Sequence, residues 1–332
     1  MPVIAAPKPQ DALRTQSHTL FGTAVHHGLS SYPKALPPWL LYDEKGSILF
    51  ESITKLPEYY LTRLEREIFL QHGDEMIAMS AQAGRLSVIE LGAGAATKTG
   101  VLLEAALRRQ GRVAYYPIDI SQSAVEDAKA RLETEYEGVA VHPILADYTR
   151  NLASIECGFR AAGRKLVLYI GSSIGNFDPP DRSDILRGLR AHLAPGDMLL
   201  LGVDMVKDPQ ALLSAYDDAA GVTAAFNKNL LIRINRELGA DFQTHRFVHR
   251  AVWNEPRSRM EMHLESLAAQ RVTIPALDLR ACFTRGETIH TENSYKFTDR
   301  GVRELLPAAD FDLRGKWSDE AEWFAVYLAA AV

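Results

Sequence analysis

The chain has 332 residues, of which 47% are hydrophobic and 24% are charged. These proportions are typical of globular proteins, so they favour one large domain or two ordinary ones and argue against a disordered chain. The formal net charge is −5 and the sequence shows no basic cluster, which argues against nucleic-acid binding. We expect a monomer that binds neither nucleic acid nor membrane.

Localisation and metal content are constrained by a few further features. The apolar run near the N-terminus is too short for a signal peptide, and no stretch is apolar enough to span a bilayer. Cys157 and Cys282 are far apart and match no metal-binding spacing, which indicates free thiols in a reducing compartment. We therefore expect a cytoplasmic protein without a metal site.

The first elements are predicted from prolines, apolar spacing and one capping pattern. Residues 1–17 carry three prolines and no periodicity, so we expect a flexible tail. Apolar residues within 48–53 recur at helical spacing and predict a short helix. Thr62, followed three residues later by Glu65, predicts the start of a helix over residues 63–83.

A regular alternation of strands and helices begins at residue 86. Strands are predicted at 86–91, 112–118, 139–145, 165–170 and 198–203. The intervening helices are predicted at 101–109, at 121–136 with Ser121 as its cap, and at 179–193. Strands that alternate with helices at this spacing predict an α/β fold with a parallel, doubly wound sheet.

The alternation stops after the fifth strand. Residues 208–238 are helix-rich, and short strands are predicted at 247–253, 258–268 and 272–274, which indicates a smaller α+β domain. The remaining elements are predicted as a strand at 287–293, a helix at 298–306 and a hairpin of 311–317 with 323–330.

The stretch from Val88 to Gly100 has the pattern of a ligand-binding turn. A short apolar strand ends in Glu90, and Gly92 and Gly94 follow it immediately before a helix. Such glycines let the backbone bend sharply and approach a ligand, and the helix N-terminus offers unpaired N–H groups. A tight structural turn is the alternative interpretation.

The details of this turn favour a ligand without phosphate. Glu90 would repel a pyrophosphate, but it suits S-adenosylmethionine, which carries a sulfonium and an amino group. Thr97 stands where the dinucleotide fingerprint requires a small residue for close packing of helix and strand.

Polar residues also follow the other predicted strands. In a parallel sheet the carboxyl ends of the strands form the ligand site, so these residues are candidates for binding. Aspartates at such junctions also cap helices, and the two roles are compatible. The five strand-end residues are Glu90, Asp119, Asp147, Asn176 and Asp204.

Several segments resemble the histidine-specific Nα-methyltransferases of ergothioneine biosynthesis. The matching segments are Leu56–Tyr60, Glu90–Gly94, Tyr169–Asn176, Tyr216–Asn227 and Glu292–Phe297, and the similarity runs from about residue 35 to the C-terminus. The resemblance implies trimethylation of the α-amine of L-histidine to hercynine with S-adenosylmethionine. It also implies a Rossmann-type class I methyltransferase domain with an antiparallel C-terminal hairpin, and a second domain that covers the active site.

The resemblance and the order of elements together predict the domain bounds. After the tail, residues 18–62 and 208–286 are expected to form the substrate-binding domain. Residues 63–207 and 287–332 are expected to form the methyltransferase domain.

The resemblance and the glycine turn also predict site residues. The expected cofactor-binding residues are Glu90, Gly92, Gly94, Lys98, Asp119, Asp147, Tyr148 and Gly171. The expected substrate-binding residues are Tyr59, Asn176, Tyr216, Met262, Glu292, Asn293 and Ser294, and the expected catalytic residues are Tyr42 and Asn176. Tyr148 replaces a phenylalanine and Asn293 an aliphatic residue of the family pattern.

Methyl transfer from a sulfonium is a direct displacement that depends on alignment and needs no covalent nucleophile. Glu292 and Ser294 lie two apart on a predicted strand and could present a carboxylate and a hydroxyl to an imidazole. Periodicity alone would favour an ordinary polar strand face. The monomethylated and dimethylated amines must also bind, and tyrosine faces suit the quaternary product, with Tyr42, Tyr59 and Tyr60 as candidates.

Three alternatives remain open at this point. The substrate could be another amino acid such as tryptophan, which the polar Asn293 motivates. The protein could be a nicotinamide-dependent oxidoreductase, against which Glu90 and Thr97 argue. It could also be a catalytically silent member that only binds the cofactor or a partner.

Overall fold

The computed structural model describes residues 9–82, 84–149, 155, 158, 160 and 162–332. Two compact units interleave along the chain, and we name them the first and second unit. The first unit consists of the described residues of Met1–Leu49 with Ala219–Val252 and Glu261–Glu292. The second unit consists of the described residues of Phe50–Asp218 with Trp253–Met260 and Asn293–Val332.

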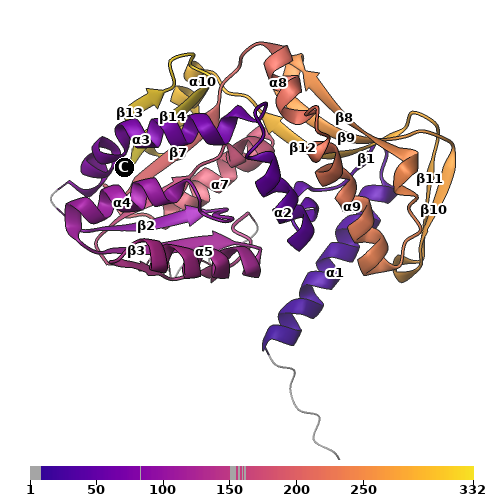
Figure 1. Cartoon of the computed structure of the whole chain (residues 1–332), viewed down its shortest axis with the longest axis horizontal. Helices are drawn as coiled ribbons and strands as arrows, with labels where there is room; N and C mark the ends of the chain where they lie inside the picture. The colour runs from indigo at the N-terminus through magenta and orange to yellow at the C-terminus, as the bar shows by residue number, and fades with distance from the viewer. Residues whose placement is uncertain (1–8, 83, 150–154, 156–157, 159, 161) are drawn as a thin grey trace, which may run out of the picture. The chain divides into compact units, whose positions relative to one another are not determined.

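The second unit contains most of the predicted α/β alternation (Figure 1). Its helices are α3 (Tyr60–Ala81), α4 (Thr99–Gln110), α5 (Gln122–Glu135), α7 (Pro179–Ala191), α8 (Pro209–Tyr216) and α10 (Asp299–Leu305). Its strands are β2 (Leu86–Leu91), β3 (Val113–Asp119), β4 (Val139–Val141), β5 (Ile144–Leu145), β6 (Arg164–Tyr169), β7 (Met198–Asp204), β13 (Phe311–Ser318) and β14 (Phe324–Ala331). Short 3-10 turns over Ser173–Asn176, Glu255–Arg257 and Pro307–Ala309 complete it.

These strands form one sheet in the order β13-β14-β7-β6-β2-β3-β4, with β5 beside β3. The strands from β2 to β7 pair in parallel, whereas β14 runs antiparallel to both β7 and β13. The order reverses between β2 and β6, which is where ligands bind in doubly wound sheets. The predicted doubly wound sheet with a C-terminal antiparallel pair is confirmed.

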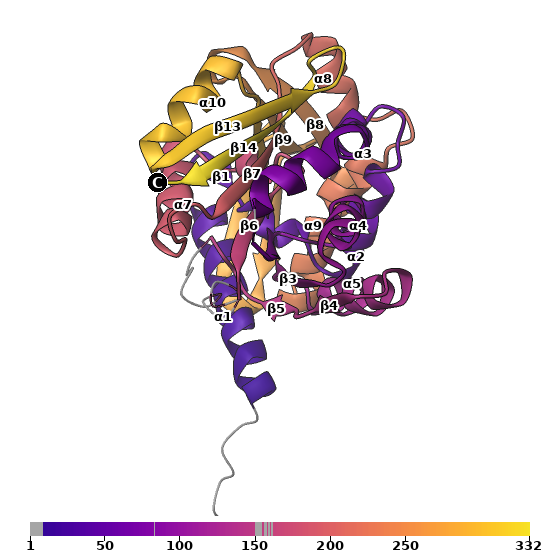
Figure 2. The same cartoon turned by 90° about the vertical axis from the view of Figure 1, so that its left-hand side faces the viewer.

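Apolar residues on both faces of the sheet hold its helices in place. One face packs against Leu186 of α7 and Val302 of α10, through side chains such as Ile89 and Val167 of the central strands. On the other face, α3 and α4 pack against each other. Helix α3 also contacts β6, β7 and β14, as Figure 2 shows, and α4 contacts β3. All six residues of β2 are buried because the sheet is covered on both sides.

The first unit is smaller and contains helices and two small sheets. Its elements are α1 (Pro9–Ser30), β1 (Lys34–Ala35), a 3-10 turn (Pro38–Leu41), the start of α2 (Glu44–Ile53), α9 (Val222–Leu238), β8 (Phe247–Asn254), β9 (Arg259–Ser266), β10 (Gln270–Ile274), β11 (Leu279–Phe283) and β12 (Thr288–Tyr295), with 3-10 turns at Thr244–Arg246 and Pro275–Leu277. One sheet has the order β1-β12-β9-β8, and β10 pairs with β11 as a hairpin. Strands β8, β9 and β12 continue across the bounds of the two units.

The structure changes several predicted bounds. Residues 50–62, 208–218 and 253–260, predicted for the substrate-binding domain, lie in the second unit, while residues 287–292 lie in the first. Strands β1 and β11 had no sequence prediction. The role of each unit in substrate or cofactor binding stays a prediction.

Two predictions about where a helix begins are wrong. Residues 9–17 belong to α1 and not to a tail, because Pro9 opens the helix at a position where its missing N–H costs no hydrogen bond. Residues 1–8 lie outside the described residues. Thr62 lies inside α3, which begins at Tyr60, and Glu65 does not turn back to cap it.

Two further predictions have a clear outcome. Ser121 caps α5 as expected, since its hydroxyl accepts a hydrogen bond from the Ala124 N–H at 3.3 Å. The strand predicted at 139–145 is divided into β4 and β5 at Pro143, which has no N–H to donate to the neighbouring β3. Within the part of the chain that the structure describes, no helix has the length and apolar character needed to cross a membrane.

Gly202 of β7 allows α3 to approach the sheet. A Cβ atom at this position would lie 2.0 Å from Glu65 Oε1 and 3.3 Å from the ring of Phe324. We expect Gly202→Ala to lower the free energy of unfolding by about 1–3 kcal/mol, as overpacking does in cores. Gly73→Ala in α3 is the control, because its Cβ would make an ordinary contact at 3.5 Å and should stabilise the helix. The prediction would be contradicted if urea unfolding gave the same change in the free energy of unfolding for both variants.

Candidate active site

The glycine turn after β2 is tied to the end of β3. Gly92 and Gly94 have φ angles of 67° and 51°, in the left-handed region that favours glycine. The N–H of Gly92 donates to the Ile118 carbonyl at 2.9 Å, and the N–H of Gly94 donates to Asp119 Oδ2 at 2.8 Å. The structure therefore brings together three predicted cofactor residues from two neighbouring strands.

Asp119 has both a capping role and the geometry of a ligand-binding group. Its carboxylate also accepts from the Ser121 N–H at 2.9 Å, at the start of α5. Burial raises its pKa, and the backbone hydrogen bonds act in the opposite direction. Tyr148 lies beside the same turn, because a Cβ atom on Gly92 would be 3.4 Å from the Tyr148 hydroxyl. Asp147, which precedes it, accepts from the Thr149 N–H at 3.0 Å.

Glu90 is a buried carboxyl group beneath the turn. It is 2% exposed, and one of its oxygens accepts hydrogen bonds from Thr99 Oγ1 at 2.7 Å and from the Tyr115 hydroxyl. Burial raises the pKa of Glu90 to about 7, although these two hydrogen bonds and the charge of Lys98 lower it. Its charge therefore changes near neutral pH, and a nearby cation would favour the ionised form.

Lys98 and Gly171 both contact Glu65, which was predicted as part of a helix-capping pattern. Glu65 of α3 is fully buried, forms an ion pair with Lys98, and accepts the Gly171 N–H at 2.8 and 3.0 Å. This burial was not predicted. The available signal was helical spacing, since Glu65 stands four residues after the buried Leu61 and four before the buried Phe69.

The groups around this turn fit S-adenosylmethionine. Carboxylates of Asp119 and Glu90 can accept hydrogen bonds from hydroxyl and amino groups, and Lys98 is neutralised by Glu65, so it does not form a phosphate clamp. A Cβ atom on Gly94 would meet nothing within 4 Å, which leaves space over the turn.

Asn176 follows β6 on a turn with constrained backbone. Gly171 and Ser172 have φ angles of 75° and 59°, and a Cβ atom on Gly175 would lie 2.8 Å from the Tyr295 carbonyl oxygen. These close approaches fix the backbone next to Asn176, which is partly exposed. Such rigidity suits a residue that has to align a substrate.

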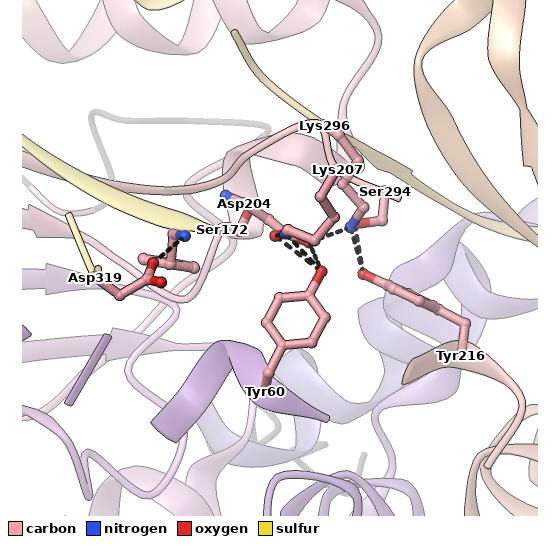
Figure 3. Close-up of polar contacts among 9 residues, drawn as sticks. Tyr60, Ser172, Asp204, Lys207, Tyr216, Ser294, Lys296 and Asp319 are labelled. Atoms are coloured by element: carbon pink, nitrogen blue, oxygen red, sulfur yellow. Dashed lines mark hydrogen bonds and ion pairs between the residues drawn. The ribbon is translucent and has the colours of Figure 1, made fainter. Parts of the chain in front are cut away.

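The end of β7 carries a buried ion cluster that the sequence analysis noted only as a strand-end aspartate (Figure 3). Asp204 is fully buried and accepts from the Tyr60 hydroxyl at 2.9 and 3.0 Å. It forms ion pairs with Lys207 and, at 2.8 Å, with Lys296. Desolvation by burial lowers the pKa of Lys207 to about 8, and the nearby Asp204 opposes this effect.

The same cluster reaches two predicted substrate residues. The Tyr216 hydroxyl donates to Ser294 Oγ at 2.7 Å, and Lys296 Nζ donates to Ser294 Oγ at 2.8 Å and to the Tyr216 hydroxyl at 2.9 Å. The ring of Tyr59 lies edge-on to that of Tyr216, with centroids 6.4 Å apart. Lys296 directly follows β12 and was missed because its position in the sequence shows no partner.

Tyr60 does not fit its predicted contact with a quaternary ammonium group. Lys207 Nζ lies 4.2 Å from the centre of its ring, and its hydroxyl is bound to Asp204. The ring face therefore already holds a cation of the protein itself.

The remaining predicted residues belong to the first unit, except for Asn293, which directly follows its last segment. Tyr42 follows the 3-10 turn and packs edge-on against Phe226 at 5.5 Å. Met262 of β9 is 2% exposed, and its carbonyl accepts from Thr291 Oγ1 at 3.0 Å. Glu292 on β12 is buried, and Asn293 is partly exposed.

One group in the first unit has metal-ligand chemistry. Among the described residues, ligand atoms of Glu261, His263 and His290 lie within 4.8 Å of one another. Glu261 Oε2 and His263 Nε2 are 2.9 Å apart and form a carboxylate–imidazole hydrogen bond. This group had no sequence prediction, because β9 and β12 are separated in the chain by β10 and β11.

Residues 21–331 match the family described as "Histidine-specific methyltransferase, SAM-dependent". The chain belongs to this family. A "Histidine N-alpha-methyltransferase" of Mycolicibacterium smegmatis is 41% identical over 326 residues, which are 98% of this chain and 97% of that protein. A protein with the same description from Mycobacterium tuberculosis is 42% identical over 313 residues, 94% and 95% of the two chains.

A third relative is the "Ergothioneine biosynthesis protein 1" of Neurospora crassa, 33% identical over 289 residues. These cover 86% of this chain and 32% of that protein. Family membership confirms the predicted family, the methyltransferase class and the S-adenosylmethionine cofactor, and it gives no support to a nicotinamide-dependent oxidoreductase.

The ion pair between the buried Glu65 and the partly buried Lys98 gives a prediction about stability. Glu65→Gln keeps the shape and an acceptor for the Gly171 N–H, but it leaves the Lys98 ammonium without its counter-charge. We expect a loss of about 3 kcal/mol in the free energy of unfolding, measured in urea. Glu67→Gln changes an exposed residue of the same helix and should have little effect. Equal losses in the two variants would contradict the assigned role.

Glu90 gives a prediction about how the stability of the protein depends on pH. Its folded-state pKa is raised from 4.5 to about 7, so the folded protein retains a proton that the unfolded chain releases. The stability of the wild type should therefore fall between pH 4.5 and 7, by on the order of 3 kcal/mol from this group. Glu90→Gln keeps an acceptor for Thr99 and should remove this part of the dependence, as melting temperatures across the pH range would show. Parallel curves for the two proteins would refute the assignment.

Proposed function

We propose that this protein transfers three methyl groups in turn from S-adenosylmethionine to the α-amino nitrogen of L-histidine, which gives hercynine. The observation that carries the proposal is the match of residues 21–331 to the histidine-specific family. Its support is a relative of nearly the same length described as a histidine N-alpha-methyltransferase. The monomethylated and dimethylated amines are substrates of the second and third transfers.

The cofactor site in this proposal is the turn after β2. S-adenosylmethionine supplies a methyl group on a sulfonium. Asp119 binds ribose hydroxyls, Asp147 and Tyr148 hold the adenine, and Gly92 and Gly94 allow the backbone to approach. Glu90, Lys98 and Gly171 complete the set, with Glu90 as the acceptor nearest the cationic end.

The reacting amine needs to lose its proton before transfer. An α-amine has a pKa of about 8 and lacks a lone pair when protonated, and a nearby sulfonium favours its neutral form. In the proposal, Asn176 and Tyr42 hold the neutral amine in line with the methyl group, because displacement depends on orientation. Tyr59 and Tyr216 contact the carboxylate end of the substrate.

The side chain of histidine is bound by Glu292 and Ser294 in this proposal, with Met262 and Asn293 beside the ring. A carboxylate accepts an imidazole N–H, and a hydroxyl serves the other ring nitrogen. Sites that hydrogen-bond a substrate reject analogues that leave these groups unpaired.

We also propose a monomeric, cytoplasmic enzyme that needs no nucleic acid or membrane. The net charge of −5 supports the first of these exclusions.

The proposal is tested by incubating the purified protein with S-adenosylmethionine and L-histidine or L-tryptophan. We expect three successive methyl additions to histidine in the mass spectrum and much slower turnover of tryptophan. Methylation of tryptophan without methylation of histidine would overturn the proposed substrate.

Substrate recognition is tested with Glu292→Ala. The KM for histidine should rise about 10- to 100-fold, as expected for loss of a hydrogen bond to a charged group, while affinity for S-adenosylhomocysteine is retained. Glu304→Ala on the exposed side of α10 is the matched control and should leave both values unchanged. An unchanged KM in Glu292→Ala would remove this residue from the site.

A further inference from the structure

The hydroxyl group of Ser294 has an unusual hydrogen-bond environment. Its oxygen accepts from two donors, the Tyr216 hydroxyl at 2.7 Å and Lys296 Nζ at 2.8 Å. Ser294 is 4% exposed, so water does not readily replace these donors. A hydroxyl oxygen has two lone pairs and one proton. Both lone pairs are used here, and the only hydrogen bond left to Ser294 is one that it donates.

The direction of these bonds is set by Lys296. An ammonium has three donors and no acceptor. Its three N–H groups match three acceptors, which are Ser294 Oγ, the Tyr216 hydroxyl at 2.9 Å and Asp204 Oδ2 at 2.8 Å. Because Tyr216 accepts from Lys296, its own proton is directed to Ser294. Figure 3 shows Ser294, Lys296 and Tyr216 close together beside Asp204.

We propose that Lys296, anchored on Asp204, is a positioning residue that directs the Ser294 proton toward the substrate, so that the enzyme binds the neutral imidazole ring with an unprotonated nitrogen facing Ser294. This inference rests on the proposed function and deepens it by naming the protonation state and tautomer of the substrate.

The chemistry of the ring supports this selection. Neutral imidazole has one N–H and one lone pair, which match the Glu292 carboxylate and a donating Ser294. Imidazolium has two N–H groups, so one of them would point at the Ser294 proton. An indole ring has an N–H but no acceptor nitrogen, and it would leave the Ser294 donor unpaired at a cost of about 1–3 kcal/mol.

Other charged and titratable groups surround this position. Asp204 is also bound by Tyr60 and Lys207, and Tyr59 packs against Tyr216. Burial lowers the pKa of Lys207 to about 8, so Lys207 stays charged below pH 7.5. Glu292 precedes Ser294 by two residues on β12. Glu90, beneath the cofactor turn, also titrates in this range, with a pKa of about 7, but it is unchanged in every variant used below. The difference in pH dependence between the wild type and a variant at Lys296 therefore follows the substrate imidazole, whose ordinary pKa is about 6.5.

The test is calorimetric titration of L-histidine into the protein saturated with S-adenosylhomocysteine. In the wild type the Kd should rise about tenfold from pH 7.5 to 5.5, because only neutral imidazole binds. In Lys296→Met the Ser294 hydroxyl gains a free lone pair and can turn to accept, so imidazolium also binds. This variant should bind more weakly at pH 7.5, and its Kd should change by about threefold or less over the same range.

A double-mutant cycle separates positioning from general disruption. If Lys296 acts through Ser294, adding Lys296→Met to Ser294→Ala should change the histidine Kd and its pH dependence no further than Ser294→Ala does alone. Lys296→Met leaves Asp204 paired with Lys207 and Tyr60, and should it still fail to fold, Tyr216→Phe replaces it in the cycle. Tyr216→Phe removes the other donor to Ser294 and should flatten the pH dependence in the same direction.

Two results would overturn the inference. One is a wild-type Kd that does not change between pH 7.5 and 5.5, and the other is a tenfold change that persists in Lys296→Met. A wild type that binds and methylates no histidine at any pH would instead refute the proposed function, so the two failures are distinguishable.

Discussion

The structure of the second unit depends on a carboxylate that has no access to water. Asp204 ends the central strand β7 at 0% exposure, and such a charge is tolerated only when it is paired and hydrogen-bonded. One partner, Lys207, follows the strand directly, and two come from distant parts of the chain, namely Tyr60 at the start of α3 and Lys296 after β12. The need to satisfy one charge thus holds these segments at the carboxyl edge of the sheet, beside Tyr216 and Ser294.

Local patterns in the sequence predicted the sheet well, because each signal lies within a few residues. An apolar run with glycines behind it predicts β2 and its turn, and Ser121 predicts the start of α5. The bounds of the two units were less predictable, since β8, β9 and β12 each continue from one unit into the other. The periodicity of a sequence predicts that a strand is present, but it does not predict which of the two units each half of that strand belongs to.

Residues of the candidate site that directly follow the strands of the sheet were predicted from the sequence. Several residues that belong to other segments of the chain were missed. Glu65 resembles any surface glutamate in sequence, and only the fold places it against Lys98 and Gly171. Lys207 and Lys296 were missed for the same reason, since a lysine is assumed to be solvated unless its partner is known. The roles of the predicted residues themselves came from the family resemblance and stay predictions.

The place of β14 in the sheet affects how the chain can fold during synthesis. This strand, Phe324–Ala331, is buried along its whole length and lies between β7 and β13. It is also made after the other described strands of this sheet, so β7 presents an unpaired apolar edge while the ribosome adds more than a hundred residues. Exposed edges of this kind pair readily with other chains. The nascent chain therefore passes through an aggregation-prone stage that chaperones would need to cover, although the finished sheet has no such edge at β7.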